Sequence, residues 1–492
     1  MPSRSFVDAF DAQVRARPAA PALSWGEEVV GYGGLDRLAR RAHRSLAALA
    51  IPDGVPVCVP ARKSPETVAL LLACFRAGRR VLVPASGLGA QALSAVCAAS
   101  GCTHVLEASG AAVRGSPVDP APARPADLPP GPGLLLTTSG STGTPKTVVL
   151  SDEGTDRFRS WAAPAFGIGP GTGVLNYAPL NFDLCLLDVW TSLAAGACVH
   201  LVDSGRAADG PHLVRLCAER APRVLQAVPL FFRLLDRAAA PGQTFPGARE
   251  ILVTGEAAPP ALLARVSAMF PGARMWNVYG CTETNDSFLH EVTPEEIRGP
   301  GPVPIGRPVD GVRARVVDGD GRVLSGACAG ELVVATPFQA KGYTDPELTG
   351  DKWDGQWFRT GDLVRRDEHG LVFLTGRNDH QVKVRGVRTN LQEVEQVVLS
   401  HPQVMEAAVI AVPDEAAGTV LHSVVRRTPG SGMNGLRLRV HCASRLPRTA
   451  IPGVIEITDE ELPRTPTGKV DRAALGRPRV PEGRPGAAMT TR

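Results

Sequence analysis

Lysine is scarce in this chain, and long hydrophobic runs are missing from it. Of 53 lysine and arginine residues only six are lysine. No stretch approaches the roughly 18 consecutive apolar residues of a membrane-spanning helix, and the N-terminal segment carries acidic residues and no apolar core, which excludes a secretory signal. The net charge of +4 comes without a long basic run, which argues against nucleic acid as a partner. We therefore expect a cytoplasmic protein that binds neither membrane nor nucleic acid.

The ten cysteines form no C-x-x-C pair and no His/Cys cluster with zinc spacing. Most lie in apolar surroundings, such as Cys74 in LLACF, which predicts buried free thiols rather than disulfides or a zinc site. Arginine serves wherever charge alone matters, so each remaining lysine is a candidate functional residue, because a compact ammonium differs in geometry from a guanidinium. These residues are Lys63, Lys146, Lys341, Lys352, Lys383 and Lys469.

Short apolar segments alternate with helical ones over the first 300 residues. The apolar segments include PVCVPA, RRVLVPA, RVLQAVP, EILVTGEA and RMWNVYG, and this alternation predicts an α/β fold with largely parallel sheets. From about residue 310 the texture changes to hairpins with Asp-Gly and His-Gly turns. An amphipathic helix, LQEVEQVVLSHPQV, and a strand, EAAVIAV, then predict a small α+β module. The Pro/Gly/Arg-rich stretch 476–492 predicts disorder.

The stretch LLLTTSGSTGTPKTVVLS, residues 134–151, nearly matches a Walker A phosphate loop. Proline at position 145 excludes that loop, because proline has no N–H and cannot adopt a positive φ. Four hydroxyl side chains and two glycines are nevertheless suited to anions, since glycine lets backbone N–H groups approach a phosphate. The alternative is a flexible Ser/Gly surface turn. The segments on both sides read as strands, which favours phosphate binding.

Further motifs follow in order: NVYGCTETN (277–285), GELVV (330–334), FRTGDLVRRD (358–367), GRNDHQVKVRG (376–386) and PRTPTGKVDRAAL (463–475). With the hydroxyl-rich loop they resemble the adenylate-forming superfamily, and most nearly the stand-alone amino acid adenylation enzymes of nonribosomal peptide synthesis. The resemblance covers residues 5–475. It implies a large N-terminal domain (1–378) of βα subdomains with a distorted β-barrel, and a small mobile C-terminal domain (379–475).

The resemblance also implies a reaction. ATP would activate an amino acid as its adenylate with release of pyrophosphate, and the acyl group would pass to the phosphopantetheine thiol of a separate carrier protein. ATP and magnesium are the implied cofactors. Charge develops on phosphoryl oxygens, so donors and a metal are needed there. The loop that would hold the phosphates contributes Thr138, Ser139, Gly140, Ser141, Thr142, Gly143 and Lys146.

Glu283 matches the family's magnesium-binding glutamate, and Thr282 the residue near the α-phosphate; the alternative for Glu283 is a surface acid. Asp362 would accept hydrogen bonds from the ribose hydroxyls with Arg377 nearby, because a carboxylate accepts twice. Taken singly, Asp362 would be a turn residue. Tyr279 would lie against the adenine, although a core aromatic is an alternative. The remaining adenine-site residues would be Gly255, Glu256, Ala257, Asn277, Val278 and Gly280.

Lys469, in the TPTGKVDR loop, would bridge the substrate carboxylate and the nucleotide and stabilise the developing charge; the alternative is a solvated surface lysine. Asp379 matches the hinge about which the small domain turns after adenylation. The turn would withdraw Lys469 and bring in the hairpin with Lys383, Arg385 and Gly386, which would line a tunnel for the thiol.

Asp183, in NFDLCLLDVW, matches the aspartate that pairs with the substrate ammonium in amino-acid-activating members; the alternative is a helix N-cap. By position in the motifs, the rest of the substrate pocket would be Leu184, Leu187, Gln226, Leu252, Thr254, Val278, Asp286 and Ser287. A pocket that is half apolar with a polar end suits a small or medium amino acid. Proline, a β-amino acid, and a side chain with a hydroxyl or second amine all stay open.

Four departures from the family pattern stand out. Cys281 replaces a proline, Thr147 a glycine, and RTNLQEVE (388–395) the usual RIELGEIE, and the C-terminal module is short around SVVRRTPGSGMNG. The last two bear on the thiolation face. No carrier segment follows residue 475, so we expect action in trans. The rivals are an acyl- or aryl-CoA ligase, an adenylation-only enzyme and a non-catalytic relative.

Overall fold

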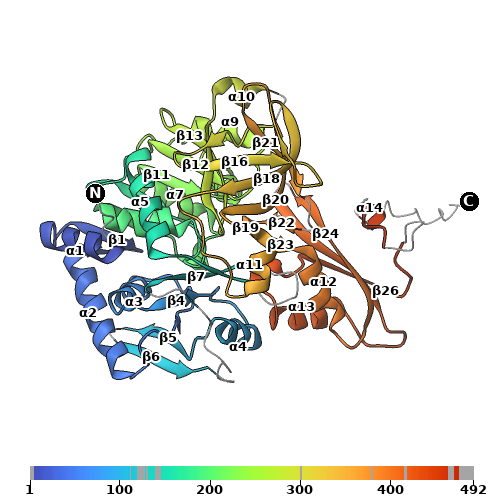
Figure 1. Cartoon of the computed structure of the whole chain (residues 1–492), viewed down its shortest axis with the longest axis horizontal. Coiled ribbons are helices and arrows are strands. Elements are labelled where there is room, and N and C mark those ends of the chain that lie inside the picture. The colour runs from blue at the N-terminus through green and yellow to red at the C-terminus, as the bar shows by residue number, and fades with distance from the viewer. Residues whose placement is uncertain are drawn as a thin grey trace, which may run out of the picture.

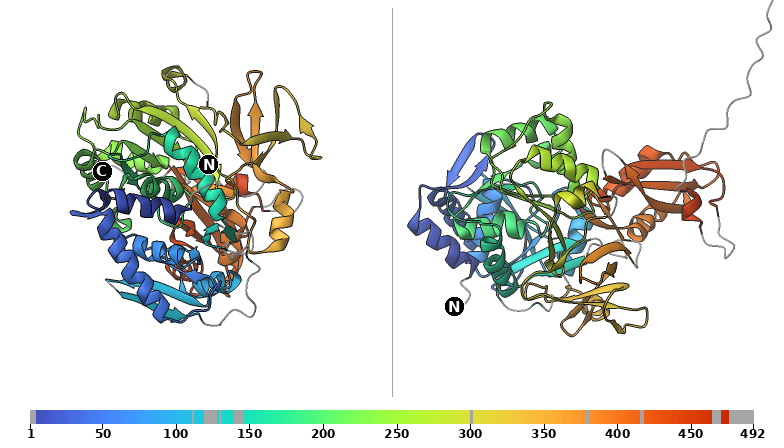
Figure 2. Two further views of the ribbon diagram at one scale, coloured as in Figure 1. Left: turned by 60° about the vertical axis from the view of Figure 1, so that its left-hand side comes forward. Right: turned by 90° about the horizontal axis from the view of Figure 1, so that it is seen from above.

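The computed structural model describes residues 5–110, 112–118, 128, 131–138, 146–299, 302–377, 381–414, 418–463 and 470–475. A large N-terminal body carries a smaller C-terminal body at one side (Figure 1), and a second view shows the smaller body projecting from the larger one (Figure 2). The smaller body has its own hydrophobic core, built from residues such as Val394, Val409, Leu421 and Leu438.

A nine-stranded sheet forms the centre of the large body. Its order is β15-β14-β13-β12-β11-β9-β10-β1-β2, and the pairs from β13 to β1 are parallel. In that order the strands are β15 (Arg307–Pro308), β14 (Asn285–Glu291), β13 (Arg274–Cys281), β12 (Glu250–Thr254), β11 (Val224–Ala227), β9 (Gly173–Asn176), β10 (Cys198–Leu201), β1 (Pro21–Trp25) and β2 (Glu28–Gly31). The central strands β10, β11 and β12 are buried along almost their whole length, as expected for parallel strands covered on both faces.

A second, six-stranded sheet follows the order β6-β5-β3-β4-β7-β8, with β5, β3, β4 and β7 parallel. The strands are β6 (Ala112–Pro117), β5 (His104–Ser109), β3 (Val57–Cys58), β4 (Arg80–Val83), β7 (Gly133–Thr138) and β8 (Lys146–Val149). The antiparallel pair β7–β8 at its edge carries the ends of the hydroxyl-rich loop.

Helices connect the parallel strands, and local sequence explains where several of them begin. Ser64 caps α3 by accepting from the N–H of Thr67, and Pro65 follows at the first helical position. Ser151 caps α5 in the same way, with two acidic residues in its first turn. The helices of the large body are α1 (Phe6–Ala16), α2 (Tyr32–Ala48), α3 (Pro65–Arg76), α4 (Ala90–Ala99), α5 (Asp152–Ala165), the π-helix η1 (Leu186–Thr191), α6 (Ser192–Ala195), η2 (Ser204–Arg206), α7 (Gly210–Arg220), α8 (Pro229–Ala238), α9 (Pro260–Met269), α10 (Pro294–Arg298) and α11 (Pro346–Lys352).

A third sheet of six strands completes the large body and is antiparallel throughout. It consists of β17 (Val323–Leu324), β16 (Arg313–Val317), β18 (Cys328–Ala335), β20 (Trp357–Arg366), β19 (Trp353–Asp354) and β21 (Val372–Arg377). The strands form an open sheet, with no pairing between the described strands β17 and β19, in the region for which the resemblance implies a distorted barrel. An isolated bridge from Gly306 to Val372 connects the sheet to the region beside β15.

The smaller body combines a hairpin, a three-stranded sheet and short helices. Its elements are β22 (Gln381–Val384), β23 (Val387–Asn390), α12 (Leu391–Leu399), β24 (Val404–Asp414), β25 (Gly418–Arg427), α13 (Gly435–Ala443), η3 (Arg448–Ala450), β26 (Val454–Thr458) and α14 (Arg472–Leu475). The strand EAAVIAV and the amphipathic helix appear where the sequence predicts them, as β24 and α12.

The predicted α/β class, with a large N-terminal body and a small α+β body, is confirmed. All ten cysteines are free and seven are buried, as predicted. None of the helices in the described part of the chain combines the length and apolarity needed to cross a bilayer. The boundary at 378/379 and the tail at 476–492 fall outside the described residues, so both stay predictions.

Candidate active site

The candidate site lies where parallel strands of the nine-stranded sheet end. The register sets Asn176, Gln226 and Leu252 side by side on β9, β11 and β12, and pairs Thr254 with Val278 on β12 and β13. Just past these ends the chain carries Asp183 after β9 and Gly255 after β12. Ligands of open α/β sheets bind outside the carboxyl ends of the strands. The predicted substrate and nucleotide residues therefore share one edge of one sheet.

The predicted phosphate loop spans a strand pair. Thr138 ends β7, Lys146 begins β8, and the two residues are partners in the antiparallel ladder, as the flanking strands predicted. The Lys146 Nζ lies 5.6 Å from the centre of the Tyr343 ring, and the Tyr343 hydroxyl donates a 2.6 Å hydrogen bond to Glu283 Oε1. The loop residues 139–143 lie outside the described residues. Lys146, at one end of the loop, is therefore connected to the predicted magnesium ligand through Tyr343.

Glu283 sits in a tight turn and is 1% exposed. The N–H of Thr284 closes that turn onto the carbonyl of Cys281, which leaves Thr282 and Glu283 at its central positions. Among the described residues no three His, Cys, Asp or Glu side chains gather as a metal cluster. A magnesium ion would therefore depend on Glu283 with phosphate oxygens and water, which is its usual environment beside a nucleotide. The residues present fit that ion.

Tyr279, Asp362 and Arg377 form a buried network at the predicted ribose end. The Tyr279 hydroxyl donates to Asp362 Oδ2 at 2.5 Å, and the Arg377 guanidinium donates to the other carboxylate oxygen. Burial and the nearby Asp362 charge hold the pKa of Tyr279 well above its usual value, so its hydroxyl stays a donor. The Tyr279 ring also packs edge-on against Phe288, with ring centres 5.8 Å apart. It is thus a core aromatic and a site residue at once.

The turn after β12 carries the predicted adenine-side residues. Gly255 has a φ of 86°, a conformation that favours glycine. Burial raises the pKa of Glu256, which accepts a hydrogen bond from the Gly386 N–H of the smaller body. The Asn277 amide donates to the Pro304 carbonyl at 2.8 Å. The other adenine-side residues are Ala257, exposed beside this turn, and Val278 and Gly280, which belong to β13.

Asp183 follows β9 and precedes the π-helix η1. Burial raises the pKa of Asp183 to about 6, with a further rise from the Glu283 charge and an opposing effect from Lys383. Cys185 occupies the N-cap of η1 and makes no side-chain capping bond, while the Asp183 carboxylate accepts a hydrogen bond from the Leu184 N–H. The pairing with a substrate ammonium and the capping alternative both stay predictions. The Asp183 carboxylate lies within electrostatic reach of both the phosphate end and the smaller body.

The hydroxyls of Thr191 and Ser192 bond to the carbonyls of Leu186 and Leu187, five residues earlier in each case. These bonds fit the wider turn of a π-helix, a form that often occurs at functional sites. Leu184, before η1, stays partly accessible. The remaining predicted pocket residues away from the polar end are buried: Leu187, Gln226, Leu252, Thr254 and Val278.

A buried polar group behind the pocket was missed by sequence reasoning. Asp188, on η1, is fully buried and accepts hydrogen bonds from Asn176 and Gln226, both at 3.3 Å. Lys63 Nζ donates to the carbonyls of Asn176 and Tyr177 at 3.2 and 3.0 Å, and burial lowers its pKa to about 8. The scarcity of lysine was the one signal that could have pointed to Lys63.

Asp286 and Ser287 occupy β14, opposite the end of β13. Burial, and then the charge of Asp183, raise the pKa of Asp286 to about 8. The Ser287 hydroxyl donates within its own segment, to the carbonyls of Thr284 and Asn285. Asp286 and Ser287 form the polar end of the pocket predicted from the sequence. The Ser287 hydroxyl already donates to backbone carbonyls, whereas no hydrogen bond to the Asp286 carboxyl occurs among the described residues.

The β22–β23 hairpin of the smaller body reaches this site. Its Gly386 N–H bonds to Glu256, and Lys383 Nζ lies 5.9 Å from the centre of the Tyr279 ring. Arg385, between them, has a φ of 52° and lies within electrostatic reach of Tyr177. The structure thus brings together all three residues predicted for the thiolation face.

Two predicted residues, Asp379 and Lys469, lie outside the described residues. On either side of the Lys469 loop, Leu462 and Val470 pack with Ala408 and Val424 in a cluster of the smaller body. Figure 1 shows α14, which follows this loop, on the side of the smaller body turned away from the larger one.

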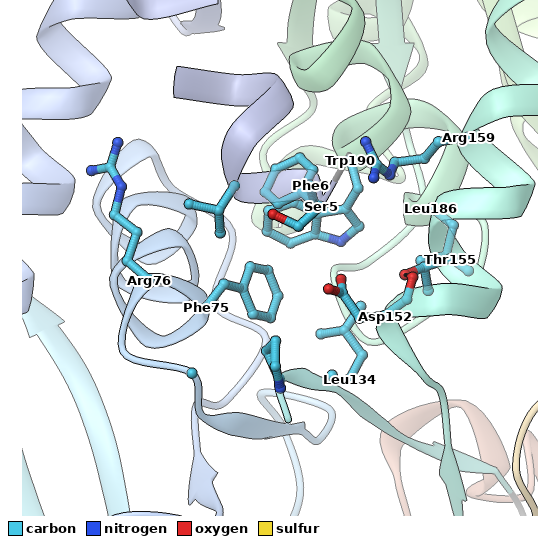
Figure 3. Close-up of a pocket in the computed structure, with 14 residues that line it drawn as sticks. Ser5, Phe6, Phe75, Arg76, Leu134, Asp152, Thr155, Arg159, Leu186 and Trp190 are labelled. Carbon is cyan, nitrogen blue, oxygen red and sulfur yellow. Dashed lines mark hydrogen bonds between the residues drawn. The ribbon is translucent and has the colours of Figure 1, made fainter. Parts of the chain in front are cut away.

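A separate cavity of about 240 Å³ lies behind η1. Phe6, Phe75, Leu186 and Trp190 line it, with Asp152 among the polar groups (Figure 3). None of the predicted nucleotide or substrate residues contributes to its lining. It is therefore a different space from the candidate active site.

Two family models match this chain. One, described as AMP-binding enzyme, matches residues 10–344, and the other, described as AMP-binding enzyme C-terminal domain, matches residues 393–469. Between them they span both bodies of the structure.

Curated relatives and solved structures agree with these matches. An L-proline--[L-prolyl-carrier protein] ligase of Streptomyces coelicolor is 35% identical over 75% of this chain and 69% of its own length. A protein of the same name from Pseudomonas fluorescens is 32% identical over 94% of this chain and 96% of its own. The structure of holo-PA1221, a nonribosomal peptide synthetase protein with adenylation and PCP domains, is 26% identical with a TM-score of 0.79, covering 96% of this chain and 84% of that one.

Replacing Asp286 with asparagine should stabilise the ligand-free protein more at alkaline than at acidic pH. The pKa of Asp286 rises from 3.8 to about 8 on burial, so the folded chain holds a proton there that the unfolded chain loses. The free energy of unfolding therefore falls as pH rises through this window, and the variant does not share that fall. We expect the Tm of the variant, relative to the parent, to rise by about 1–3 °C between pH 5 and pH 8.5. Scanning calorimetry measures it, and an equal Tm difference at both pH values would contradict the assignment.

Proposed function

This chain belongs to the AMP-binding enzyme family, and we propose that it activates an amino acid with ATP and loads it onto a carrier protein. The amino acid becomes an aminoacyl-adenylate with release of pyrophosphate, and its acyl group then moves to the phosphopantetheine thiol of a separate carrier protein. The names of its relatives, which are carrier-protein ligases for L-proline, support both halves of this activity.

One observation carries the choice of an amino acid over other carboxylic acids. Asp183 holds a half-buried carboxylate that lies close enough to Glu283, at the phosphate end, for the charge of Glu283 to raise its pKa. A desolvated carboxylate needs a cationic partner, and the ammonium group of an amino acid supplies one. With its ammonium on Asp183, the substrate can extend its own carboxylate toward the nucleotide. A fatty or aryl acid would leave Asp183 uncompensated.

The nucleotide would lie along the strand ends, with its phosphates toward Thr138, Lys146 and Glu283 and its ribose toward Asp362. Each Asp362 oxygen already accepts one hydrogen bond, from Tyr279 or Arg377, and keeps capacity for a ribose hydroxyl because a carboxylate oxygen has two lone pairs. Magnesium on Glu283 would supply charge compensation for the phosphate oxygens. Thr282, beside Glu283, would face the α-phosphate.

In the first half-reaction a substrate carboxylate oxygen forms a bond to the α-phosphorus. The bond from that phosphorus to the bridging oxygen breaks, and pyrophosphate leaves. Negative charge grows on the α-phosphoryl oxygens during this step, so a fixed cation there lowers the barrier. Lys146 would hold the leaving pyrophosphate, and Lys469 would contact the reacting carboxylate and phosphate when the smaller body turns it inward.

In the second half-reaction the carrier thiol sulfur bonds to the acyl carbon, the acyl–phosphate bond breaks, and AMP leaves. The orientation of the smaller body supports this step, because the β22–β23 hairpin lies at the site through Gly386 and Lys383. The flanks of the Lys469 loop pack within the smaller body instead. A turn about Asp379 would exchange these two arrangements. We assign the reaction to the cytoplasm, which keeps the ten free thiols reduced.

Exchange of radiolabelled pyrophosphate into ATP tests the first half-reaction. We expect exchange with at least one amino acid and none with fatty or aryl acids; the reverse preference would favour a CoA ligase. Lys469→Ala should lower exchange by about 10² or more, as for the loss of a transition-state charge partner. Lys352→Ala, at the end of α11, is the matched control and should leave exchange unchanged. Undiminished exchange in Lys469→Ala would refute the role given to Lys469.

Gly386→Ala should impair carrier loading and spare adenylation. A Cβ on Gly386 would collide with the Val228 side chain while the hairpin lies at the site, and its φ of 81° disfavours alanine. We expect carrier loading to fall about tenfold or more, with exchange within about twofold of the parent, because adenylation uses the other orientation.

The matched control is Gly355→Ala, which has a φ of 56° but open space around its Cβ position. It should leave both activities intact. Equal losses of exchange and loading in Gly386→Ala would show that the hairpin contact serves the fold and not the second half-reaction.

A further inference from the structure

Hydrogen-bond acceptors accumulate at the substrate end of the site, without matching donors. Asp286 is 8% exposed, and no hydrogen bond to its carboxylate occurs among the described residues. Its charge and that of Asp183 act on each other strongly enough to raise the pKa of Asp286. The two carboxylates reach the same space from different elements, Asp183 from the segment after β9 and Asp286 from β14.

Gln226 adds a third acceptor and points independently to a ligand. Its Nε2 donates to the Leu184 carbonyl at 3.0 Å and to Asp188 Oδ1 at 3.3 Å, which uses both of its N–H groups. The residue is 1% exposed, and its Oε1 is buried with no hydrogen-bond partner. The amide is therefore fixed next to Leu184, the residue that follows Asp183, and its oxygen keeps an unused capacity to accept a hydrogen bond.

The nearby cations do not satisfy these acceptors. Lys63 Nζ is committed to the carbonyls of Asn176 and Tyr177, behind the pocket. Lys383 lowers the pKa of Asp183 and belongs to the hairpin of the smaller body. The proposed domain turn would move this hairpin away from the site during adenylation. The other charged neighbours, Asp188 and Glu283, are themselves acidic. None of the described residues thus supplies a donor to the Asp286 carboxyl or to Gln226 Oε1, and the substrate is the source of donors that the proposed function places at this end of the site.

An amino acid with one ammonium group pairs with Asp183 and leaves Asp286 buried, protonated and without a hydrogen-bond partner among the described residues. A second ammonium group supplies the positive charge that lets Asp286 ionise, and it can also donate to an amide oxygen, because it carries three N–H groups. We infer that the substrate is a diamino acid, with its α-ammonium on Asp183 and its side-chain ammonium between Asp286 and Gln226 Oε1. This inference rests on the proposed function. The apolar walls from Leu187 and Leu252 would enclose the methylene chain between the two groups.

The test is pyrophosphate exchange with matched pairs of substrates. Each diamino acid, from 2,3-diaminopropionate to lysine, is compared with an isostere whose terminal methyl replaces the amine, and proline is included. We expect the best diamino acid to exceed its isostere in kcat/KM by about 10² or more, since a site built to bind a polar group rejects the analogue that lacks it. Best activity with proline or another monoamino acid would overturn the inference and leave the proposed function standing. A failure of every amino acid would overturn the proposed function itself.

Two variants separate recognition from folding. In Asp286→Leu, the ratio of kcat/KM for the diamino acid to kcat/KM for its apolar isostere should fall at least about 10²-fold. Asp320→Asn, on the exposed β16–β17 turn, is the control and should leave this ratio unchanged. Equal losses for both substrates in Asp286→Leu would assign Asp286 to the fold and refute the inference.

Discussion

A half-buried carboxylate that forms no ion pair with any of the described residues organises this site. Asp183 lies at the end of the parallel strands, where burial and Glu283 raise its pKa and Lys383 of the smaller body lowers it. Removing a charge from water is unfavourable unless a partner replaces the lost hydration. Both the substrate ammonium and Lys383 can serve as that partner. The occupancy of the pocket and the position of the smaller body therefore act on the same group.

The contacts between the two bodies follow the same logic. Glu256 belongs to the turn that would face the adenine, yet in this arrangement it accepts the Gly386 N–H. Tyr279 similarly faces both the nucleotide network, through Asp362, and the hairpin, through Lys383. If these residues bind the nucleotide as proposed, the same side chains would contact the nucleotide in one half-reaction and the hairpin in the other.

Much of this site could be predicted from the sequence, because its motifs are local. Thr138 and Lys146 lie at the two ends of one short loop between paired strands. Asp362 and Arg377 are partners on two strands that follow each other in the sequence. The Lys63, Asp188 and Gln226 network could not be predicted in this way. Lys63 bonds to the carbonyl of Asn176, which lies 113 residues further along the chain, and Gln226 bonds to Asp188, which lies 38 residues before it. Asn176 and Gln226 are brought together because β9 and β11 are neighbours in the sheet. The π-helical form of η1 was equally hidden, since it depends on two hydroxyls bonding five residues back. The roles of Asp379 and Lys469 stay predictions.

The cavity behind η1 bears on how such a pocket changes its selectivity. Leu186 and Trp190 border that space (Figure 3). Asp188, on the same π-helix, accepts a hydrogen bond from Gln226. Incomplete packing on one flank lets a helix settle in a new position when nearby side chains grow or shrink. Divergence toward new substrates thus has a second route here, through bulk added at Phe6 or Phe75, remote from every atom that the nucleotide would touch.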